Sequence, residues 1–465
     1  MTSSPLHLFA FVGLLLYFGI LILIVLREKK NQNALDYFFA GRSLPFWALS
    51  LTFIASWWGA GSALSTADLA FEDGLGAFWY YGVPVILSCL FMFLASGAIR
   101  RVNHLTQGQM MAARYSPLVA KLLSVMILLF MIFTAASQMV GIGQFFGQYM
   151  GMNYEVAVLL GTGIVLLYSL FGGFRGVVLT DIVQFVLLLV SALVVFALAW
   201  SRAGGWDAIA LAAEQSGKAD FMSLSAGFEQ YAVYVITFSL AWAIQANVWQ
   251  RISATRNAKE AKRMTAMSLL AFIPLYLIVV LTGMAGIVLY KELPAGGIVS
   301  AIVIHEMHPL MGAFVFVGIS AAIMSTMDSL LNTAAMTWTL DIQSKGNQLR
   351  TARYATLGAT LLALLIALQI RSILEISWIA ADLITTGAFV PLILGYIWKR
   401  GSNRAALASM IWALLYCGYN LAIQFGLNLP TCWQASSAAQ VAYGLLGSLI
   451  LYVGISLAPC RLNRS

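Results

Sequence analysis

The sequence predicts an all-α polytopic membrane protein, and three observations carry this prediction. Of the 465 residues, 61% are hydrophobic and 9% are charged, whereas a soluble domain carries about 25% charged residues on average. Apolar runs of roughly 20 residues, the length that crosses a bilayer as a helix, recur along the whole chain. Lys and Arg are concentrated in alternate loops between these runs. The composition therefore excludes a soluble enzyme.

The chain contains about thirteen candidate membrane spans by this measure. They lie near residues 6–26, 46–67, 76–98, 118–146, 154–171, 180–200, 228–248, 264–290, 309–340, 352–370, 374–397, 404–425 and 438–458. The first run is followed by Arg27-Glu28-Lys29-Lys30 and not by a small-residue cleavage site, so we interpret it as a retained helix and not a signal peptide. An odd number of spans places the two ends of the chain on opposite sides of the membrane.

The basic residues predict the orientation of these spans. If the loop after the first span is cytoplasmic, all but four of the 26 Lys and Arg fall in inside loops. The four outside are Arg202, Lys218, Lys291 and Arg371. The positive-inside rule then places the N-terminus outside and the C-terminus inside. The net charge of +8 belongs to the inner loops, so we expect no nucleic-acid partner. No loop is long enough for a soluble domain, and we expect a single transmembrane domain over 1–465.

The sequence contains no motif that predicts a metal site, a nucleotide-binding site or covalent catalysis. The cysteines Cys89, Cys417, Cys432 and Cys460 show no metal-ligand spacing, and the four histidines lie near helix ends or in loops. A G-x-x-x-x-G-K-[ST] phosphate loop is absent from the sequence. We therefore expect neither an enzyme nor an organic cofactor, and any uphill transport has to draw on an ion gradient. Membrane lipid and a small-molecule substrate are the expected partners, with no obligate protein partner.

Three acidic residues of the predicted spans are functional candidates. Asp328 is inside 309–340, Asp382 is inside 374–397, and Asp181 is at the inner start of 180–200. Polar residues at this depth are functional candidates because lipid disfavours them. We predict no Lys or Arg at the same depth, and unpaired buried carboxylates either take up a proton or face cations. The alternative is a carboxyl group hydrogen-bonded between helices.

Two predicted spans have sequences that favour a broken helix. Residues 56–62 read SWWGAGS, with two glycines and two serines around a Trp pair. Broken helices at membrane depth occur where freed carbonyl groups line a cavity or bind an ion. The alternative is ordinary packing of small residues between helices. A similar interruption, WAIQAN, lies at 242–247, five spans later, which is the spacing expected of two five-helix repeats of opposite topology.

Span 309–340 offers the oxygen ligands that a small hard cation prefers. Ser325 and Thr326 supply adjacent hydroxyl groups, and the carbonyl group of Ala322 lies within their reach, one turn back. A Ser-Thr pair alone is weak evidence, because such hydroxyls usually bond to their own helix. Its value comes from pairing with the broken span 46–67, whose freed carbonyl groups could complete a cage.

Several strings in these segments resemble the solute:sodium symporter family, over essentially all thirteen spans. They are DYFFAGRSL at 36–44, GGFRGVVLTDIVQ at 172–184, Gln250-Arg251, and AAIMST at 321–326. The resemblance implies a LeuT-like fold of two inverted five-helix repeats, placed here at 46–200 and 228–397. One extra helix, 6–26, precedes the repeats and two, within 404–458, follow them. A multi-pass protein of the cell membrane, in a bacterium the inner membrane, is then expected.

The resemblance also implies where Na+, the coupling ion, binds. Carried over by position, the ligands are the carbonyl groups of Ala55, Trp58 and Ala322 and the hydroxyl groups of Ser325 and Thr326. Asp181 matches an acid near the inner exit for sodium. Some members hold a second sodium one turn further along, where this chain has Asp328 and Ser329. Asp181, Asp328 and Ser329 therefore form a possible second cation site, with an acid in place of a hydroxyl.

Within the family, the chain looks most like the choline-transporter branch. Trp57 falls where that branch places an aromatic cage residue, and Asp328 and Asp382 fall on acids of the branch. Gln245 departs from it, since the branch has a second cage Trp there. We expect the substrate site at Trp57, Gln245, Asn247 and Asp382, where aromatic faces and carboxylates favour a small organic cation or zwitterion. The alternative for the Trp pair is that it only fills space.

Together these features predict a sodium-coupled secondary active symporter that imports a small organic solute by alternating access. A sugar, an amino acid or a monocarboxylate is the alternative substrate to an amine. An ion channel would show a pore-lining filter and would not need two broken helices. A membrane-embedded enzyme would need a nucleophile and base or a metal site, which the histidines are too few and too scattered to supply.

Overall fold

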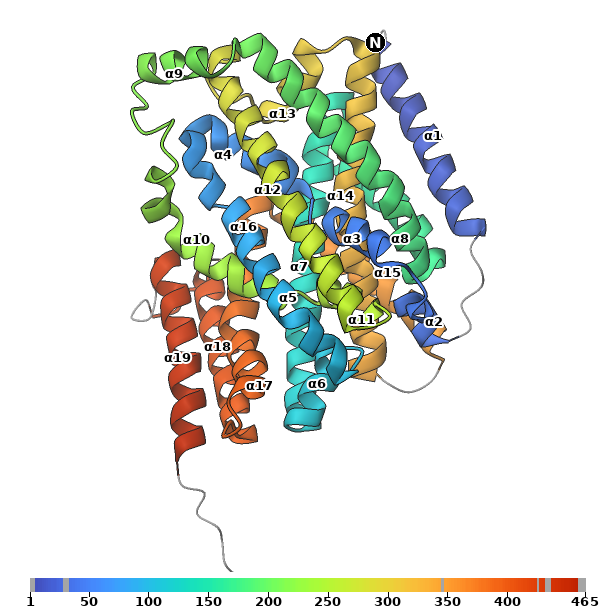
Figure 1. Ribbon diagram of the computed structural model, residues 1–465, viewed down its shortest axis with the longest axis vertical. Helices are drawn as coiled ribbons and strands as arrows, with labels where there is room; N and C mark the ends of the chain where they lie inside the picture. Colours follow the sequence, from blue (N-terminus) through green and yellow to red (C-terminus); the bar gives the residue numbers. More distant parts are fainter. Residues whose placement is uncertain (1–4, 28–32, 344–346, 425, 431–435, 459–465) are drawn as a thin grey trace, which may run out of the picture.

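The computed structural model describes residues 5–27, 33–343, 347–424, 426–430 and 436–458. Every regular element within these ranges is a helix, and the helices form one elongated bundle (Figure 1). The predicted class of all-α membrane protein is thus confirmed. Some of the basic residues predicted to face the inside lie outside the described ranges, namely Lys29, Lys30, Lys345, Arg461 and Arg464.

By length and composition, the described residues contain 11 helical segments that could cross a membrane, or 12 if a pair bent by 113° counts as one span. Helix α8 (Tyr154–Ala203) has 50 residues, which at 1.5 Å per residue is about 75 Å, far longer than the roughly 30 Å hydrocarbon core. It bends at Gly173, where φ is 55° and ψ is −171°, a conformation that glycine adopts readily. The bend falls between the predicted spans 154–171 and 180–200. The count of thirteen and the orientation stay predictions.

Both predicted breaks in the helices are present. Helix α3 (Phe46–Ala55) ends before the irregular residues 56–59, after which the chain continues as the π-helical turn η2 (Gly61–Ser65) and α4 (Thr66–Asp73). Helix α10 (Ala226–Ala243) is separated from α11 (Ala246–Ala254) by Ile244 and Gln245. Each break exposes backbone groups that a continuous helix would bond internally, so each needs partners from neighbouring helices.

Helix α14 (Pro309–Thr337) runs through the centre of the bundle. It contacts α7 (Pro117–Met150), α8 and α1 (Pro5–Arg27). Every residue from Val315 to Thr337 is buried, so its polar side chains face other helices and not lipid. A helix that is buried all round can be apolar on every side, and the polar residues it does carry are therefore the informative ones.

The C-terminal helices lie at the edge of the bundle, at the lower left of Figure 1. Helices α18 (Asn403–Gln424) and α19 (Ser437–Leu457) contact each other and the π-helical segment η6 (Thr385–Leu394). Helix α15 (Gln348–Gln369) covers α7, α8 and α14 on another side. The remaining elements are α2 (Ala34–Phe39), η1 (Ala40–Arg42), η3 (Gly74–Trp79), α5 (Gly82–Val102), α6 (Gln107–Arg114), α9 (Trp206–Gln215), α12 (Ala258–Leu289), α13 (Ile298–Ala301), η4 (Ile302–Glu306), η5 (Trp338–Gln343), α16 (Ile373–Ile384) and α17 (Gly395–Ile397).

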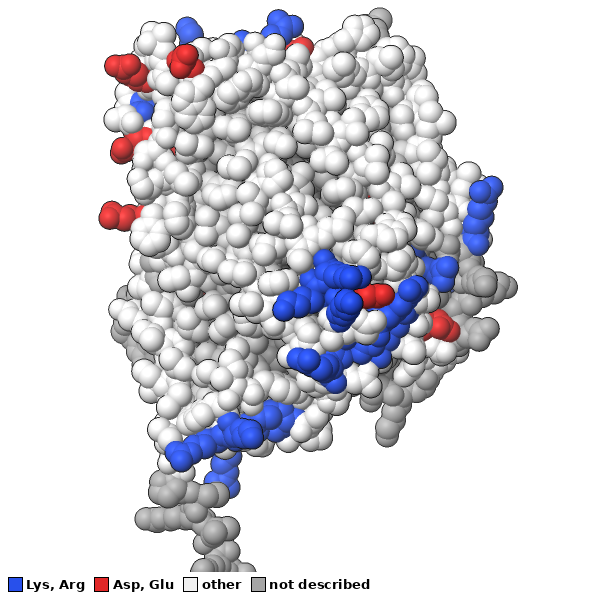
Figure 2. All heavy atoms as spheres, in the orientation of Figure 1, with Lys and Arg blue, Asp and Glu red and all other residues white. Residues whose placement is uncertain are grey.

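The surface carries its charges at two ends. On the face drawn in Figure 2, Lys and Arg gather over the lower part and acidic side chains lie mostly along the upper left edge, with an almost uncharged belt between them. An uncharged belt is what the hydrocarbon core of a bilayer requires of the protein surface.

Candidate functional site

The break between α3 and α4 is held open by Gln138, a residue of α7. The backbone N–H of Ala60 donates to Gln138 Oε1 at 2.7 Å. A Cβ atom at Gly59 would lie 2.1 Å from the same oxygen, so glycine allows Gln138 to approach the break this closely. Gln138 is not among the residues predicted from the sequence, although an amide within the apolar span 118–146 is a signal that could have indicated it.

Oxygen atoms from α3 and α14 meet at this break. Thr326 Oγ1 lies 3.1 Å from the carbonyl oxygen of Ala55 and 3.3 Å from that of Ala322. Ser325, the next residue on α14, instead donates to Asp181 Oδ1. Trp58 lies within the break, and its ring contacts Tyr276 with ring centroids 4.9 Å apart. The structure thus brings together three of the five residues predicted to bind sodium, and all five are buried.

Arg251 corrects one prediction from the sequence. No basic residue was expected at the depth of the acids, and Arg251 was placed in an inside loop. The structure buries it completely, and its Nη2 atom lies 3.4 Å from Asp181 Oδ2 and 2.6 Å from Ser329 Oγ. All nine residues of α11 are buried, so the segment after the second break continues inside the bundle, as part of the same candidate span Ala226–Ala254. A charge buried there has to be paired, and Asp181 pairs it.

Asp181 therefore lies in a cluster of polar side chains from four helices, which we call the Asp181 cluster: Thr52, Asp181, Arg251, Ser325 and Ser329. The carboxylate accepts hydrogen bonds from Thr52 of α3, Ser325 of α14 and Arg251 of α11. Thr52 Oγ1 also accepts from Arg251 Nη2 at 3.0 Å. The cluster ties the first and second halves of the chain together directly beside the oxygen atoms at the break.

Asp328 belongs to a different set of contacts. Its Oδ1 atom accepts from Ser169 of α8, while Oδ2 is buried without a hydrogen-bond partner among the described residues. A buried carboxylate oxygen left unpaired is unfavourable, so it invites a cation or a proton. Two of the three residues predicted for the second cation site, Asp181 and Ser329, are joined through Arg251. The third, Asp328, faces Ser169 instead.

The predicted substrate residues fall into two groups. Trp57 donates from Nε1 to Gln245 Oε1, across the two breaks. The amide atoms of Asn247 are buried and have no partner among the described residues. Asp382 faces the C-terminal helices: its Oδ2 atom accepts from Gln440 Nε2 of α19 at 2.6 Å and from Cys417 Sγ of α18 at 3.5 Å. The structure thus joins Trp57 to Gln245 and turns Asp382 elsewhere.

An aromatic wall that the sequence analysis missed lies beside the first break. It consists of Tyr81, Phe238, Trp242 and Tyr276. Phe238 and Trp242 stack with ring centroids 4.7 Å apart, and Tyr81 lies 4.7 Å from Trp242. A Cβ atom at Gly61 would lie 2.3 Å from the Tyr81 hydroxyl, so this wall directly contacts the broken helix. The spacing of Phe238 and Trp242, one helical turn apart in span 228–248, was the available signal.

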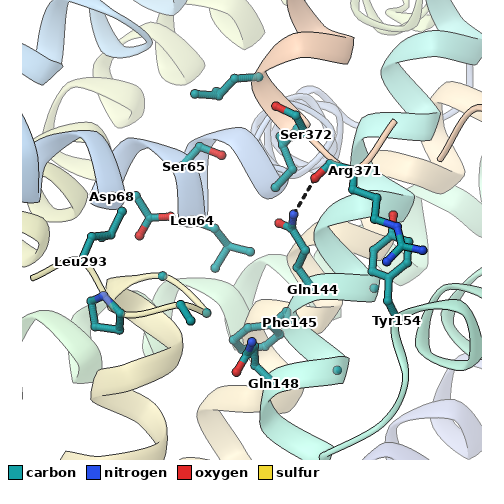
Figure 3. A pocket seen from close by; sticks show the side chains of 18 of the residues that line it. Leu64, Ser65, Asp68, Gln144, Phe145, Gln148, Tyr154, Leu293, Arg371 and Ser372 are labelled. Atoms are coloured by element: carbon teal, nitrogen blue, oxygen red, sulfur yellow. Dashed lines mark hydrogen bonds between the residues drawn. The ribbon is translucent and has the colours of Figure 1, made fainter. Parts of the chain in front are cut away.

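A cavity of about 670 Å³ opens beside α4, at the end of the bundle where α13 lies (Figures 1 and 3). Leu64 and Ser65 of the broken helix line it, together with polar side chains such as Asp68 and Gln144. Gln144 Nε2 donates to the carbonyl oxygen of Arg371 at 2.8 Å, the dashed line in Figure 3. By the predicted topology, this is the outer end.

Arginine side chains join segments at the opposite end, where α2, α6 and α11 lie (Figure 1). Arg42 Nε donates to the carbonyl oxygen of Ser253 at 3.0 Å, and Arg100 Nε to that of Thr255 at 2.7 Å. These bonds fix the end of α11 against η1 and α5. One end of the bundle is thus hollow, and segments at the other end are held together by hydrogen bonds.

The fold of this chain is similar to that of a solved sodium symporter. A solved structure of a Na+-coupled sialic acid symporter, in a substrate-bound outward-open state, superposes with a TM-score of 0.77 at 21% identity, covering 97% of this chain and 98% of that one. The chain therefore has the LeuT-like fold of a sodium symporter, as predicted.

The family follows from the sequence. The family described as "Sodium:solute symporter family" matches residues 37–413. The high-affinity proline transporter PutP of Bacillus subtilis is 26% identical over 82% of this chain and 86% of its own length. The high-affinity choline transporter 1 of Drosophila melanogaster is 23% identical over 86% of this chain and 69% of its own length. This chain belongs to the sodium:solute symporter family, so it is a sodium-coupled membrane transporter of a solute and not an enzyme. The relatives do not single out choline as the substrate.

Proposed function

We propose that this protein imports a small cationic or zwitterionic amine together with Na+ by alternating access, in the inner membrane of a bacterium. The observation that carries the proposal is the meeting of hydroxyl and carbonyl oxygens from α3 and α14 at a broken helix, beside an aromatic wall. Ion sites built on discontinuous helices near the middle of the membrane are the usual device of transporters with this fold.

The sodium site of this proposal uses the carbonyl oxygens of Ala55, Trp58 and Ala322 and the hydroxyl oxygens of Ser325 and Thr326. Two supports are that Thr326 Oγ1 already contacts two of the carbonyl oxygens and that an all-oxygen cage suits a hard cation. An ion there bridges α3 to α14, which belong to different predicted repeats. Binding that favours one arrangement of the repeats shifts the population toward it.

A second cation is proposed at Asp328 and Ser329, with Asp181 alongside. The support is the unpaired, buried Oδ2 atom of Asp328. Ser329 Oγ already accepts a hydrogen bond from Arg251 Nη2 at 2.6 Å, so it would bind the cation through its second lone pair. A proton on Asp328 is the competing explanation for the same unpaired oxygen.

For the substrate we propose Trp57, Gln245 and Asn247, next to the aromatic wall. The unpaired amide of Asn247 offers both a donor and an acceptor, and aromatic faces attract an ammonium group. The name of the similar choline transporter agrees in this respect, since choline contains a positively charged nitrogen, whereas the names of the similar proline transporter and sialic acid symporter give solutes of the alternative classes. Asp382 stays part of the proposal: its Oδ2 atom accepts from α18 and α19, while its Oδ1 atom is buried without a partner among the described residues. A sugar, an amino acid or a monocarboxylate is the alternative substrate.

A ligand screen on purified protein tests the proposal. Thermal melting is measured with amines, betaines, amino acids, sugars and monocarboxylates, each in Na+ and in K+. We expect stabilisation by an amine or a zwitterion that depends on Na+, followed by Na+-driven uptake of that solute into proteoliposomes. Stabilisation by galactose or by a simple monocarboxylate, with none by any amine, contradicts the substrate. Stabilisation that is equal in K+ contradicts the sodium coupling.

A further inference from the structure

A groove lies on the outer surface of the bundle between α7, η5 and α15, and none of the residues proposed for transport lines it. It encloses about 350 Å³ and is lined mainly by apolar residues, among them Leu128 of α7 and Leu362 of α15. Small residues of α15 make the surface hollow here. A Cβ atom added to Gly358 would meet no described atom within 4 Å.

One end of the groove carries aromatic and basic side chains. Trp338 and Tyr354, which are 40% and 62% exposed, both line it. Arg350 is exposed one turn before Tyr354, with its Nη2 atom 3.3 Å from the tyrosine hydroxyl. Trp and Tyr favour the interface between hydrocarbon and headgroups, so this end lies at the level of the headgroups and the rest of the groove lies among acyl chains.

The charge at this end matches one kind of occupant. Arg353, on the next face of α15, is also exposed. Asp341 of η5 turns its carboxylate toward α6, where Thr106 Oγ1 donates to it at 2.5 Å. By the predicted topology, this end of α15 faces the cytoplasm, where the membrane surface is rich in anionic lipids.

We infer that the groove is a binding site for one anionic phospholipid of the inner leaflet. One acyl chain fills the hollow along Leu128, Gly358 and Leu362, and the phosphate group binds Arg350. The hollow adds contacts that a flat helix surface cannot offer, because each carbon atom then has neighbours on several sides. The arginine adds a preference for anionic headgroups, worth roughly fivefold in affinity for one basic residue at the membrane surface. The inference does not depend on the proposed substrate.

Two variants and a matched control test the site. Gly358→Leu places a side chain in the hollow, and Gly418→Leu adds the same side chain to an exposed glycine of α18 that also has open space around it. Arg350→Gln removes the charge and keeps the groove. Each purified protein is titrated with phosphatidylglycerol and with phosphatidylcholine in detergent, and bound lipid is counted by native mass spectrometry. Melting temperatures within a few degrees of the wild type establish that a variant is folded.

We expect one phosphatidylglycerol to bind more tightly than phosphatidylcholine, and Arg350→Gln to remove about fivefold of that preference. Gly358→Leu should weaken both lipids at least fivefold, while Gly418→Leu leaves them unchanged. Equal binding of the two lipids to the wild type overturns the inference. So does unchanged lipid binding in Gly358→Leu, or loss of bound phosphatidylglycerol on adding inorganic phosphate alone, which would mean that the arginine binds free phosphate. If Gly358→Leu does not fold, Arg350→Gln tests the inference alone, and an unchanged preference for phosphatidylglycerol in that variant overturns it.

Discussion

Thr326 offers the sharpest test of the sodium site, because its hydroxyl contacts both α3 and α14, which belong to different predicted repeats. Its Oγ1 atom lies 3.1 Å from the carbonyl oxygen of Ala55 on α3 and 3.3 Å from that of Ala322 on its own helix. Thr326→Ala removes this oxygen and leaves the two carbonyl groups in place. The side chain is buried, so water is not expected to replace the oxygen at full strength.

The size of the effect follows from the loss of one ligand oxygen. A hydrogen bond or contact to a charged group is worth about 1.5–3 kcal/mol, and every 1.4 kcal/mol is a factor of about ten in affinity. We therefore expect the Na+ concentration for half-maximal uptake to rise between about tenfold and a hundredfold. The double variant Ser325→Ala with Thr326→Ala should lie at or above this range, but it also removes a donor to Asp181, so the single variant is cleaner.

The assay is initial uptake of the solute into proteoliposomes over a range of Na+ concentrations at fixed membrane potential. Two controls accompany it. Thr326→Ser keeps the oxygen and should retain most of the affinity. Ser320→Ala removes another buried hydroxyl of α14, one that bonds to the carbonyl oxygen of Phe316 on its own helix at 2.6 Å, and should leave Na+ dependence unchanged. Unchanged Na+ dependence in Thr326→Ala, or an equal shift in Ser320→Ala, would refute this site.

The remaining predictions concern charge. Asp328→Asn should remove one Na+ per transport cycle and lower the charge moved per solute. If the number of Na+ per solute is unchanged and the pH dependence of uptake is lost, Asp328 carries a proton instead. If neither changes, Asp328 has a structural role only. Arg251→Gln should lower the melting temperature strongly, because removing one partner of a buried ion pair costs about 3–5 kcal/mol; a melting temperature like that of Arg256→Gln, an exposed arginine just after the end of α11, would contradict the pairing with Asp181. In uptake competition, quaternary amines or betaines should displace the solute better than neutral sugars, and strong competition by galactose alone would exclude the amine.

Features that depend on a few neighbouring residues could be predicted from the sequence. The break at 56–59 follows from two glycines beside a Trp pair, and the oxygen-rich part of α14 is visible as Ser and Thr within an apolar run. The family strings in turn predicted the fold. These signals are local, and lipid makes polar residues at such depth easy to notice.

Features that depend on how distant segments meet could not be predicted. Arg251 follows an interruption and precedes other basic residues, so the sequence places it in a loop, and only the packing of α11 inside the bundle buries it. Asp382 lies inside a span, but the helix face it occupies is decided by α18 and α19. Gln138 reaches the break through the packing of α7 against η2. Each outcome rests on tertiary contacts that hydropathy does not encode.

The two oxygen atoms of the Asp181 carboxylate have different partners, and this division has a consequence. Ser325 donates to Oδ1, whereas Thr52 and Arg251 both donate to Oδ2. A serine hydroxyl has lone pairs as well as a proton, so Ser325 can offer its oxygen to an arriving ion while its proton stays on Oδ1. The buried carboxylate then keeps a partner on each oxygen whether the ion is present or absent. Binding and release of an ion in every cycle therefore leave the hydrogen bonds of the cluster in place.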